Sequence, residues 1–309
     1  MKKIDLGKSG LLVPNIAVGC MRISPMPKAE LRKFIETAMD NGANFFDHAD
    51  IYGKENSGDS EIAFANAVEM NAGVREKMII QSKCGIRDTT FDFSKEYILR
   101  SVDGILDRLK TDYLDILLLH RPDALFEPEE VAEAFDILEK SGKVRHFGVS
   151  NQKPMQIELL KKSVKQKITA NQLQLSITNS NMITHGFFVN METEQAVSRD
   201  ESILDYCRLH DITIQAWSPF QYGFFEGCFI GNTEKYAELN KTLDKIAKKY
   251  GVSSTTIAAA WIIRHPAKMQ VVLGTTSESR LKECITASEL TLTREEWYEI
   301  WQSAGNYLP

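Results

Sequence analysis

The sequence contains few of the features that mark secreted, zinc-binding or membrane proteins. Only five of its 309 residues are cysteine, an odd number, and they are scattered without a C-x-x-C pair. This pattern argues against a disulfide framework or a zinc site and predicts reduced thiols in the cytoplasm. No apolar run approaches the ~20 residues of a membrane span, and polar residues interrupt the apolar run near the N-terminus, so we expect neither a membrane partner nor a secretion signal.

An excess of basic charge is also lacking. The formal net charge is −5, from 37 Lys and Arg against 42 Asp and Glu, which argues against nucleic acid as a partner. There is no G-x-G-x-x-G turn, and "GKSG" at 7–10 lacks the preceding glycine of a phosphate loop. A small-molecule partner is therefore expected, and the composition does not define an oligomeric state.

Short apolar runs alternate with helical patterns along the whole chain. The expected strands cover residues 15–21, 43–49, 78–85, 113–120, 144–151, 168–176, 212–219 and 270–277. Eight strand–helix units without a linker predict a (β/α)₈ TIM barrel built as one domain, residues 1–309. An open doubly wound sheet is the alternative, but the glycine-rich turn that would favour it is absent.

Further patterns predict the elements around these strands. "KKIDLGKSGLLVP" indicates a β-hairpin that closes the barrel floor, and "TREEWYEIWQSAGNYLP" indicates an extra C-terminal helix and tail. "SKEYILRSVDGILDRLK" predicts a helix capped by Ser94. Two helices have expected apolar faces, formed in one by Leu99, Val102, Leu106 and Leu109 and in the other by Val131, Ala134, Phe135 and Leu138.

Polar residues stand where successive expected strands end. Asp47 and Tyr52 follow the second strand, Lys83 ends the third and His120 ends the fourth. Barrel enzymes carry their catalytic groups at these strand ends. Each residue alone is explained equally well by a structural role, such as an ion pair or a buried histidine. The four together favour a catalytic site.

Tyr52 and Lys83 form a plausible proton donor. A free phenol is a weak acid, with a pKa of about 10. An ammonium about 4 Å away contributes about 4 kcal/mol at an effective dielectric of about 20 and lowers that pKa. Burial acts in the opposite direction, so we expect a reduced net lowering. Asp47 would keep the lysine charged, and His120 would orient a substrate carbonyl by a hydrogen bond.

The motifs "FFDHADIYG", "SKCG", "YLDILLLHRPD", "GKVRHFGVSN", "NQLQLS", "WSP" and "GTTSESRL" follow one another in this order. With them the chain resembles the aldo-keto reductases over nearly its whole length, and specifically a little-characterised bacterial branch. The resemblance implies reduction of an aldehyde or ketone by NADPH, with NADH less favoured. It assigns the catalytic tetrad to Asp47, Tyr52, Lys83 and His120. A non-catalytic NADP(H)-binding regulatory subunit of the same fold is the alternative.

The resemblance also implies a set of cofactor contacts. They are Cys20, Met21, Asp47, Ser150, Asn151, Gln172, Trp217, Ser218, Pro219, Gly274, Thr275, Thr276, Ser277 and Arg280. Ser150, Asn151 and Gln172 match the residues that hold the nicotinamide amide, and Trp217 matches the aromatic that stacks on the ring. "GTTSESR" ends a strand and opens a helix, which suits a phosphate, with Arg280 placed for a 2′-phosphate. An ordinary capped helix start explains the same residues equally well.

Three positions depart from the family pattern. Trp217 stands where tyrosine is commoner, Cys284 where an asparagine often contacts the adenine, and His48 where threonine or serine is usual. His48 is expected behind the tetrad or against the cofactor. Asp50 is expected in a turn or beside the cofactor ribose.

Two other enzyme classes compete for the same residues. Asp47-His48-x-Asp50 suggests a metal-dependent hydrolase, but adjacent strand residues face opposite sides and cannot both bind one ion. No metal is therefore expected. Lys83 alone would suit a Schiff-base aldolase.

Two long loops, 177–200 and 220–233, are expected to roof the substrate pocket. Their aromatic residues are Phe187, Phe188, Phe220, Tyr222, Phe224, Phe225 and Phe229. Such residues favour an apolar or aromatic carbonyl substrate, with simple loop packing as the alternative. Met21 is expected at the floor of the site. Trp297, Trp301 and Tyr307 are expected to pack the C-terminal helix.

Overall fold

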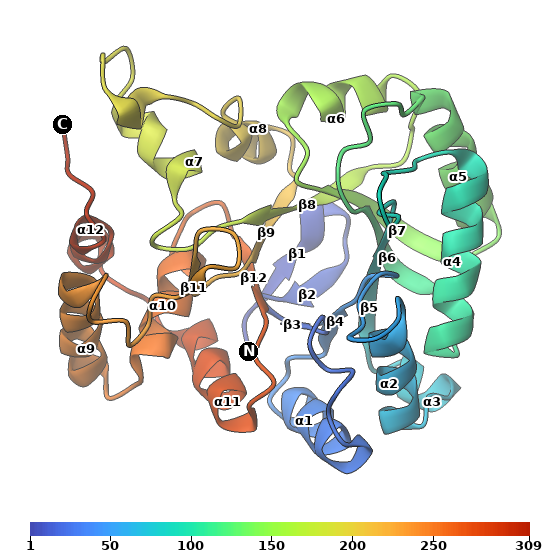
Figure 1. Ribbon diagram of the computed structural model, residues 1–309, viewed down its shortest axis with the longest axis horizontal. Helices are drawn as coiled ribbons and strands as arrows, with labels where there is room; N and C mark the ends of the chain where they lie inside the picture. The colour runs from blue at the N-terminus through green and yellow to red at the C-terminus, as the bar shows by residue number, and fades with distance from the viewer.

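The computed structural model describes residues 1–309, and eight parallel strands close into a barrel at its centre (Figure 1). Around the barrel the order is β12 (Gln270–Leu273), β3 (Ile16–Gly19), β4 (Phe45–Asp47), β5 (Ile79–Cys84), β6 (Leu114–Leu119), β7 (Val144–Ser150), β8 (Ile168–Gln174) and β9 (Thr213–Trp217). β12 pairs in parallel with both β3 and β9, which closes the ring. The expected (β/α)₈ barrel is confirmed, and the open doubly wound sheet is wrong.

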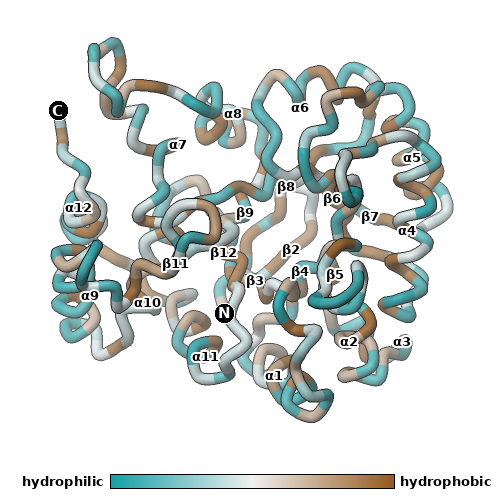
Figure 2. Tube along the Cα trace, viewed as in Figure 1, coloured by the Kyte–Doolittle hydropathy of each residue, from teal (hydrophilic) through white to brown (hydrophobic).

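Helices surround the barrel. They are α1 (Lys28–Asp40), α2 (Asp59–Val68), α3 (Ala72–Arg75), α4 (Lys95–Leu109), α5 (Pro128–Lys140), α6 (Pro154–Lys161), α7 (Asn181–Thr184), α8 (Ile203–Leu209), α9 (Ala237–Tyr250), α10 (Ser254–Ile263), α11 (Glu278–Thr286) and α12 (Arg294–Ser303). Figure 2 shows hydrophilic and hydrophobic residues alternating along outer helices such as α4 and α5. None of the helices has the length and apolar character needed to cross a bilayer. All five cysteines are free, and the cytoplasmic location stays a prediction.

The two helix faces expected from the sequence are found with one correction. α5 buries all four expected residues. In α4, Ser94 caps the helix by accepting a hydrogen bond from the Tyr97 N–H. Leu99 is only half-buried, because Ile98 and Ile105 occupy the core-facing stripe instead. The helical period places residues 98, 102, 105 and 109 on one face, whereas 99 lies at its edge.

All eight expected strands end later in the sequence than the observed ones; for β6 the difference is one residue, since it was expected to reach 120 and ends at Leu119. The expected strand 43–49 is β4, which ends at Asp47, and 270–277 is β12, which ends at Leu273. Beyond β4 the chain still contacts the barrel, since the His48 N–H donates to the Gln81 carbonyl and the Asp50 N–H to the Lys83 carbonyl. The polar residues at the strand ends therefore belong to loops that the barrel rim holds in place.

A hairpin closes the barrel floor, as expected. β1 (Lys3–Asp5) and β2 (Leu12–Pro14) pair antiparallel and are joined through the 3₁₀ turn η1 (Leu6–Lys8). Leu6 is fully buried and packs with the inward side chains of the barrel. Gly7 has φ +57°, and a Cβ there would lie 2.4 Å from the Thr169 carbonyl oxygen. Only glycine lets the turn approach the strands this closely.

The C-terminal helix α12 packs beside α9 and α10, and the chain ends next to it (Figure 1). Trp297 stacks on Trp261 of α10 at 4.9 Å, and each indole N–H donates to the other residue's backbone carbonyl. Trp301 is also buried, so both tryptophans pack the helix as expected. Tyr307 differs: it is 46% exposed, in the tail, with its ring edge against Phe188.

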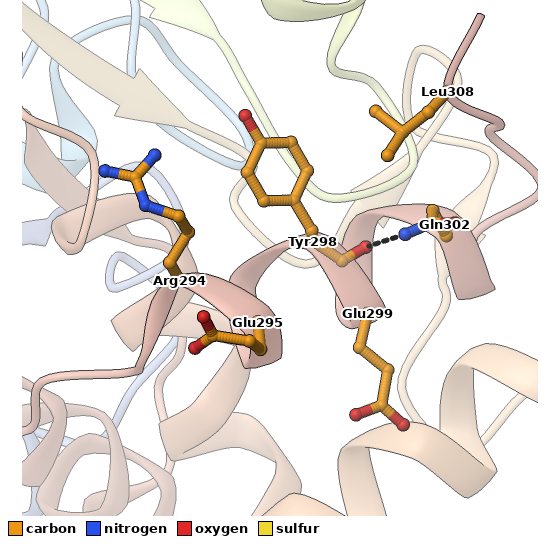
Figure 3. Close-up of a pocket in the computed structure, with 6 residues that line it drawn as sticks. All are labelled: Arg294, Glu295, Tyr298, Glu299, Gln302 and Leu308. Carbon is orange, nitrogen blue, oxygen red and sulfur yellow. Dashed lines mark hydrogen bonds between the residues drawn. The ribbon is translucent and has the colours of Figure 1, made fainter.

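The outer side of α12 carries an open surface depression of about 480 Å³ (Figure 3). Its lining residues are Arg294, Glu295, Tyr298, Glu299, Gln302 and Leu308. The Gln302 amide within it donates to the Tyr298 carbonyl at 3.4 Å. The depression shares no residue with the predicted site, and it is open to solvent rather than enclosed.

Candidate active site

The end of β4 and the neighbouring β5 bring Asp47 and Lys83 together inside the barrel. Both side chains are buried. The Lys83 Nζ donates to the Asp47 Oδ2 at 2.8 Å, to the His48 carbonyl oxygen at 2.7 Å and to the Tyr52 hydroxyl oxygen at 3.1 Å. The ammonium has three donors and all three are used. Its position and charge are therefore fixed by the surrounding groups.

The environment keeps Lys83 protonated. Burial alone would lower the pKa of this lysine, but the charge of Asp47 and the contact with Tyr52 more than offset it. The pKa of Lys83 therefore lies above its ordinary value. An aldolase lysine must instead lose its proton to attack a carbonyl. The site does not favour that chemistry.

The expected net lowering of the Tyr52 pKa is wrong. Burial raises the pKa of this phenol, and the neighbouring Lys83 ammonium offsets the rise only in part. Desolvation disfavours the phenolate more than one paired ammonium stabilises it. Tyr52 accordingly holds its proton at neutral pH. Because its oxygen accepts from Lys83, its own O–H remains available as a donor.

A tight turn after β4 positions Tyr52. Its backbone N–H donates to the Ala49 carbonyl, and its carbonyl accepts from the Ser60 N–H at the start of α2. The next residue, Gly53, has no room for a side chain, since a Cβ would lie 1.8 Å from the Asn56 carbonyl oxygen. The motif D-I-Y-G thus encodes the turn that places the phenol over Lys83.

His120 faces Tyr52 from the end of β6. The two rings meet edge to face with centroids 5.9 Å apart. The histidine backbone N–H donates to the Cys84 carbonyl, and its Nδ1 is buried without a partner. Burial, with the charges of Lys83 and Arg121, holds the pKa of His120 well below its ordinary value. The imidazole is neutral and can donate one hydrogen bond to a carbonyl oxygen.

The predicted nicotinamide residues also lie together. The Ser150 hydroxyl donates to the Gln172 carbonyl at 3.1 Å, and the Asn151 amide donates to the Ser150 hydroxyl at 2.7 Å. The Trp217 indole N–H donates to the Asn151 Oδ1 at 3.2 Å. Asn151 and Ser218 both adopt positive φ, near +57° and +50°. These backbone turns direct the side chains toward the barrel mouth.

Three other predicted cofactor residues differ in how far their side chains are exposed. Cys20 is buried and its backbone N–H donates to the Asp47 carbonyl at 2.9 Å. Pro219 is buried too. Met21 is 37% exposed and lies in the loop that follows β3, and its expected place at the floor of the site stays a prediction. Cys20 and Pro219 therefore support the site backbone and offer a ligand little surface.

The residues predicted to bind a phosphate lie in the connection between β12 and α11. Ser277 caps α11 by accepting from the Arg280 N–H, and the Ser277 N–H donates to the Thr275 hydroxyl. Thr276 and Arg280 are exposed. Glu278, whose charge could have repelled a phosphate, forms ion pairs with Lys33 and Lys282, and these hold its pKa at about 2. This cationic surround fits a phosphate. Cys284 is fully buried.

His48 and Asp50 lie behind the tetrad. His48 packs edge-on against Phe64 of α2 at 4.7 Å, with both ring nitrogens buried and unpartnered, and burial lowers its pKa to about 3. The pKa of Asp50 is raised to about 7, first by burial and then by Glu61. Asp47 thus points into the barrel, whereas His48, the first residue after β4, points outward to α2. No group of three His, Cys, Asp or Glu side chains is placed to hold a metal ion.

The loop expectation needs correction for several aromatics. Phe187 packs against Trp301 of α12 with centroids 5.0 Å apart, and Phe188 is fully buried. These two, with the buried Phe229, hold the loops down and do not roof the site. Phe224 and Phe225 remain exposed, each 6.3 Å from the Trp217 ring. They are the loop aromatics at the mouth.

Sequence reasoning missed a buried layer of glutamines across the barrel. They are Gln81, Gln172, Gln215 and Gln270, on β5, β8, β9 and β12. The Gln81 and Gln172 amides donate to the Asp47 Oδ1 at 2.6 Å and 3.1 Å. The Gln172 amide also lies 3.3 Å from the Gln215 Oε1. Only the Gln172 side-chain carbonyl remains for a ligand amide.

A signal for this layer was present in the sequence. Gln81 stands two residues before Lys83, and Gln215 two residues before Trp217. The strand period of two puts each pair on the same inward face. A neutral polar residue two positions before a site residue therefore indicates a hydrogen-bonded layer below the site. Arg121, directly after His120, was also overlooked.

Comparisons with known proteins agree with this geometry. The Aldo/keto reductase family model matches residues 15–304, so the chain belongs to that family. The chain is 35% identical to the uncharacterized oxidoreductase YcsN of Bacillus subtilis (strain 168), over 99% of each chain. It is 33% identical to a 6-dehydroglucose reductase of Novosphingobium aromaticivorans, over 99% of this chain and 96% of the relative.

A solved structure matches the fold as well. The aldo-keto reductase from Klebsiella pneumoniae, determined in complex with NADPH, superposes with a TM-score of 0.76 at 22% identity, covering 97% of this chain and 94% of that one. The enzyme class predicted from the sequence, an aldo-keto reductase, is confirmed by the family match.

Proposed function

We propose that this enzyme reduces an aldehyde or ketone to an alcohol with NADPH and that Tyr52 donates the proton. One observation carries the proposal: the Tyr52 hydroxyl lies 3.1 Å from the Lys83 Nζ, which is itself 2.8 Å from Asp47. This chain of a half-buried phenol, a buried ammonium and a buried carboxylate suits a general acid that must deliver a proton from a water-poor cleft. The family match supports the carbonyl reductase class.

The cofactor supplies the hydride, from C4 of its nicotinamide ring. Trp217 offers the stacking face, while Ser150, Asn151 and the free carbonyl of Gln172 suit the carboxamide. Arg280 and the turn at Thr275–Ser277 suit the 2′-phosphate, since a guanidinium forms paired hydrogen bonds with phosphate oxygens. The NADPH complex of the Klebsiella pneumoniae relative supports this cofactor.

The chain's own groups divide the proton chemistry. The substrate carbonyl oxygen accepts hydrogen bonds from the Tyr52 hydroxyl and from neutral His120, which fix its orientation. As the carbon is reduced, Tyr52 passes its proton to the oxygen. The neighbouring Lys83 ammonium stabilises the phenolate that forms, because a charge-assisted hydrogen bond is about twice as strong as a neutral one.

Replacing Tyr52 by Phe tests the assignment. The variant removes the proton but keeps the ring, so we expect kcat to fall by a factor of about 10² to 10⁴, the usual contribution of general acid catalysis. NADPH affinity, measured by quenching of protein fluorescence, should be unchanged. Turnover is measured by NADPH oxidation with a panel of aldehydes, ketones and quinones.

Arg280→Met is the matched variant for the cofactor end. It should weaken NADPH binding far more than NADH binding and leave kcat at saturating cofactor nearly unchanged. If Tyr52→Phe lost NADPH affinity in step with its rate, the proton-donor role would be wrong. Tight NADPH binding by the wild type without turnover on any carbonyl would favour the non-catalytic regulatory alternative.

A further inference from the structure

Arg121 lies at the mouth of the site, directly after His120. Its guanidinium carbon is 5.8 Å from the Trp217 ring centroid and 5.9 Å from that of Phe224. The side chain is half-buried, and burial lowers the pKa of Arg121 while Tyr52 raises it. The cation thus shares its surroundings with the phenol and with the aromatic ring that suits the nicotinamide.

This guanidinium has no hydrogen-bond or ion-pair partner in the protein. The other arginines that are buried or half-buried are Arg32, Arg75, Arg108 and Arg264, and each of them donates to a carboxylate or a backbone carbonyl. Arg121 donates to neither. Asp123, two residues further on, is buried and accepts from the Phe93 and Leu125 N–H groups instead.

The aromatic neighbours do not replace a counter-ion. Cation–π attraction requires the cation within about 6 Å of the ring centroid, and both rings are near that limit. Five guanidinium N–H donors are left for another molecule. Withdrawing a charge from water without a partner is unfavourable. A ligand group that accepts several hydrogen bonds and carries negative charge would satisfy them.

Lys83, the other cation of the site, is already saturated. Its three donors are directed to Asp47, His48 and Tyr52, and the nearby His120 is neutral. The site therefore has two polar ends for a substrate. Tyr52 and His120 meet the carbonyl oxygen, and Arg121 is the remaining cation, next to the exposed ring of Phe224.

We propose that Arg121 binds an anionic group, a carboxylate or a phosphate, on the carbonyl substrate, and that the enzyme prefers acidic aldehydes or ketones to neutral ones. This inference rests on the proposed reductase function. The planar guanidinium fork matches a carboxylate or phosphate in a paired geometry. The net charge of −5 gives the protein no general attraction for anions, so a local cation is needed to select them.

The test compares matched substrates. We would measure kcat/KM with NADPH for 4-carboxybenzaldehyde and 4-methylbenzaldehyde, and for succinic semialdehyde and butanal. Glyceraldehyde 3-phosphate and glyceraldehyde distinguish a phosphate from a carboxylate preference. The wild type should favour the acid of a pair. In Arg121→Met this preference should fall by roughly 10- to 100-fold, mainly through KM, as expected for loss of a charged hydrogen bond.

Two further variants separate the charge of Arg121 from its shape and from a general loss of positive charge. Arg121→Lys should retain part of the preference, because it keeps the charge and loses the fork. Arg100→Met removes an exposed arginine of α4 and should leave kcat/KM unchanged for both substrates of a pair. An equal loss for acid and neutral substrates in Arg121→Met would show a structural role. Weakened NADPH binding of the same size would assign Arg121 to the cofactor instead, and a wild type that prefers glyceraldehyde to its phosphate and butanal to the semialdehyde would also overturn the proposal.

Failure of the reductase function itself is recognised separately. If the wild type oxidises no NADPH with any carbonyl, binding of 4-carboxybenzaldehyde to the NADPH complex is measured by calorimetry. Binding that Arg121→Met abolishes would still support the anion site. Equal binding by both proteins would refute it.

Discussion

The inner face of β4 and β5 and the outward-facing residues just after β4 carry buried polar groups of opposite character. On the inner face, Asp47 and Lys83 are paired with each other, and the Gln81 and Gln172 amides donate to the other oxygen of the carboxylate. On the outer face, His48 has two unpartnered ring nitrogens and Asp50 an unpartnered Oδ1. The strands place neighbouring residues on alternate sides, so a step of one residue separates the two environments.

This difference shows how one short motif keeps a charged pair where the proposed proton transfer needs it and lowers the charge of the groups behind it. On the inner face, burial would lower the pKa of Lys83, but the Asp47 carboxylate 2.8 Å away helps to raise it above its ordinary value. Burial acts on the outer groups without such a partner. It lowers the pKa of His48 to about 3, so the imidazole is neutral, and together with Glu61 it raises the pKa of Asp50 to about 7, so that carboxyl is about half protonated at neutral pH. Behind them, Glu61 accepts from Ser82 and Arg108.

The largest effect is expected when the inner cation is removed by Lys83→Met. The variant leaves Asp47 buried and unpaired, so we expect a loss of about 3–5 kcal/mol in the free energy of unfolding. Carbonyl reduction should fall by a factor of about 10² or more, because Tyr52 loses the ammonium that stabilises its phenolate. Urea denaturation and the initial rate of NADPH oxidation measure the two effects.

The double variant Asp47→Asn/Lys83→Met is the control for this experiment. It removes both charges and should recover most of the lost stability, because no unpaired charge remains buried. Activity should stay low. A single variant as stable as the wild type would mean that the pair is not as tightly enclosed as its contacts indicate.

The outer face is tested by the pH dependence of stability. The folded protein holds the Asp50 proton up to pH about 7, whereas the unfolded chain releases it near pH 4. The stabilisation is therefore complete below pH 4 and is lost as the pH rises through 7. Asp50→Asn removes this dependence, and relative to the wild type it should gain up to about 4 kcal/mol between pH 4 and 8.

His48 gives the opposite sign. Its lowered pKa means that the folded protein excludes a proton that the unfolded chain binds below pH 6.5. That stabilisation is complete above pH 6.5 and is lost as the pH falls toward 3. His48→Leu should therefore gain on the wild type as the pH falls. Unfolding free energies at pH 5 and pH 8 distinguish the two variants, and slopes of the same sign would refute the comparison.

The barrel and the grouping of the four predicted tetrad residues at its mouth were predictable because their signals are local. Asp47, Lys83 and His120 each stand at the end of an apolar run, and parallel strands bring such ends to one mouth. The direction of the Tyr52 pKa was not predictable. It depends on whether burial, which raises the pKa, outweighs the Lys83 ammonium, which lowers it. The depth of burial of the phenol cannot be obtained from the sequence.

Contacts between distant segments were the other limit. The partners of Phe187 and Phe188 are on α12 and in the tail, more than 100 residues later, so their role in the loop could not be separated from a role in the pocket. The lone charge of Arg121 was hidden for the same reason. Its lack of a partner is visible only when every carboxylate in the fold has been placed.

The glutamine layer provides the smallest and most specific test. Gln215 exchanges hydrogen bonds with Gln81 at 3.0 Å and donates to Gln270 at 2.8 Å. Gln215→Leu leaves the side-chain carbonyl oxygens of Gln81 and Gln270 without their donor, so we expect a loss of about 1–3 kcal/mol in unfolding free energy. The rate should fall by less than about tenfold, because the Asp47–Lys83 pair keeps its own contacts.

Gln174→Leu is the matched control, since it removes one hydrogen bond from a half-buried glutamine of β8 to the Gly223 carbonyl. It should destabilise the protein less than Gln215→Leu. If Gln215→Leu lost as much activity as Lys83→Met while remaining folded, the layer would be holding Asp47 in place. In that case the neutral amides below the site, and not the ion pair alone, would fix the positions of Asp47 and Lys83.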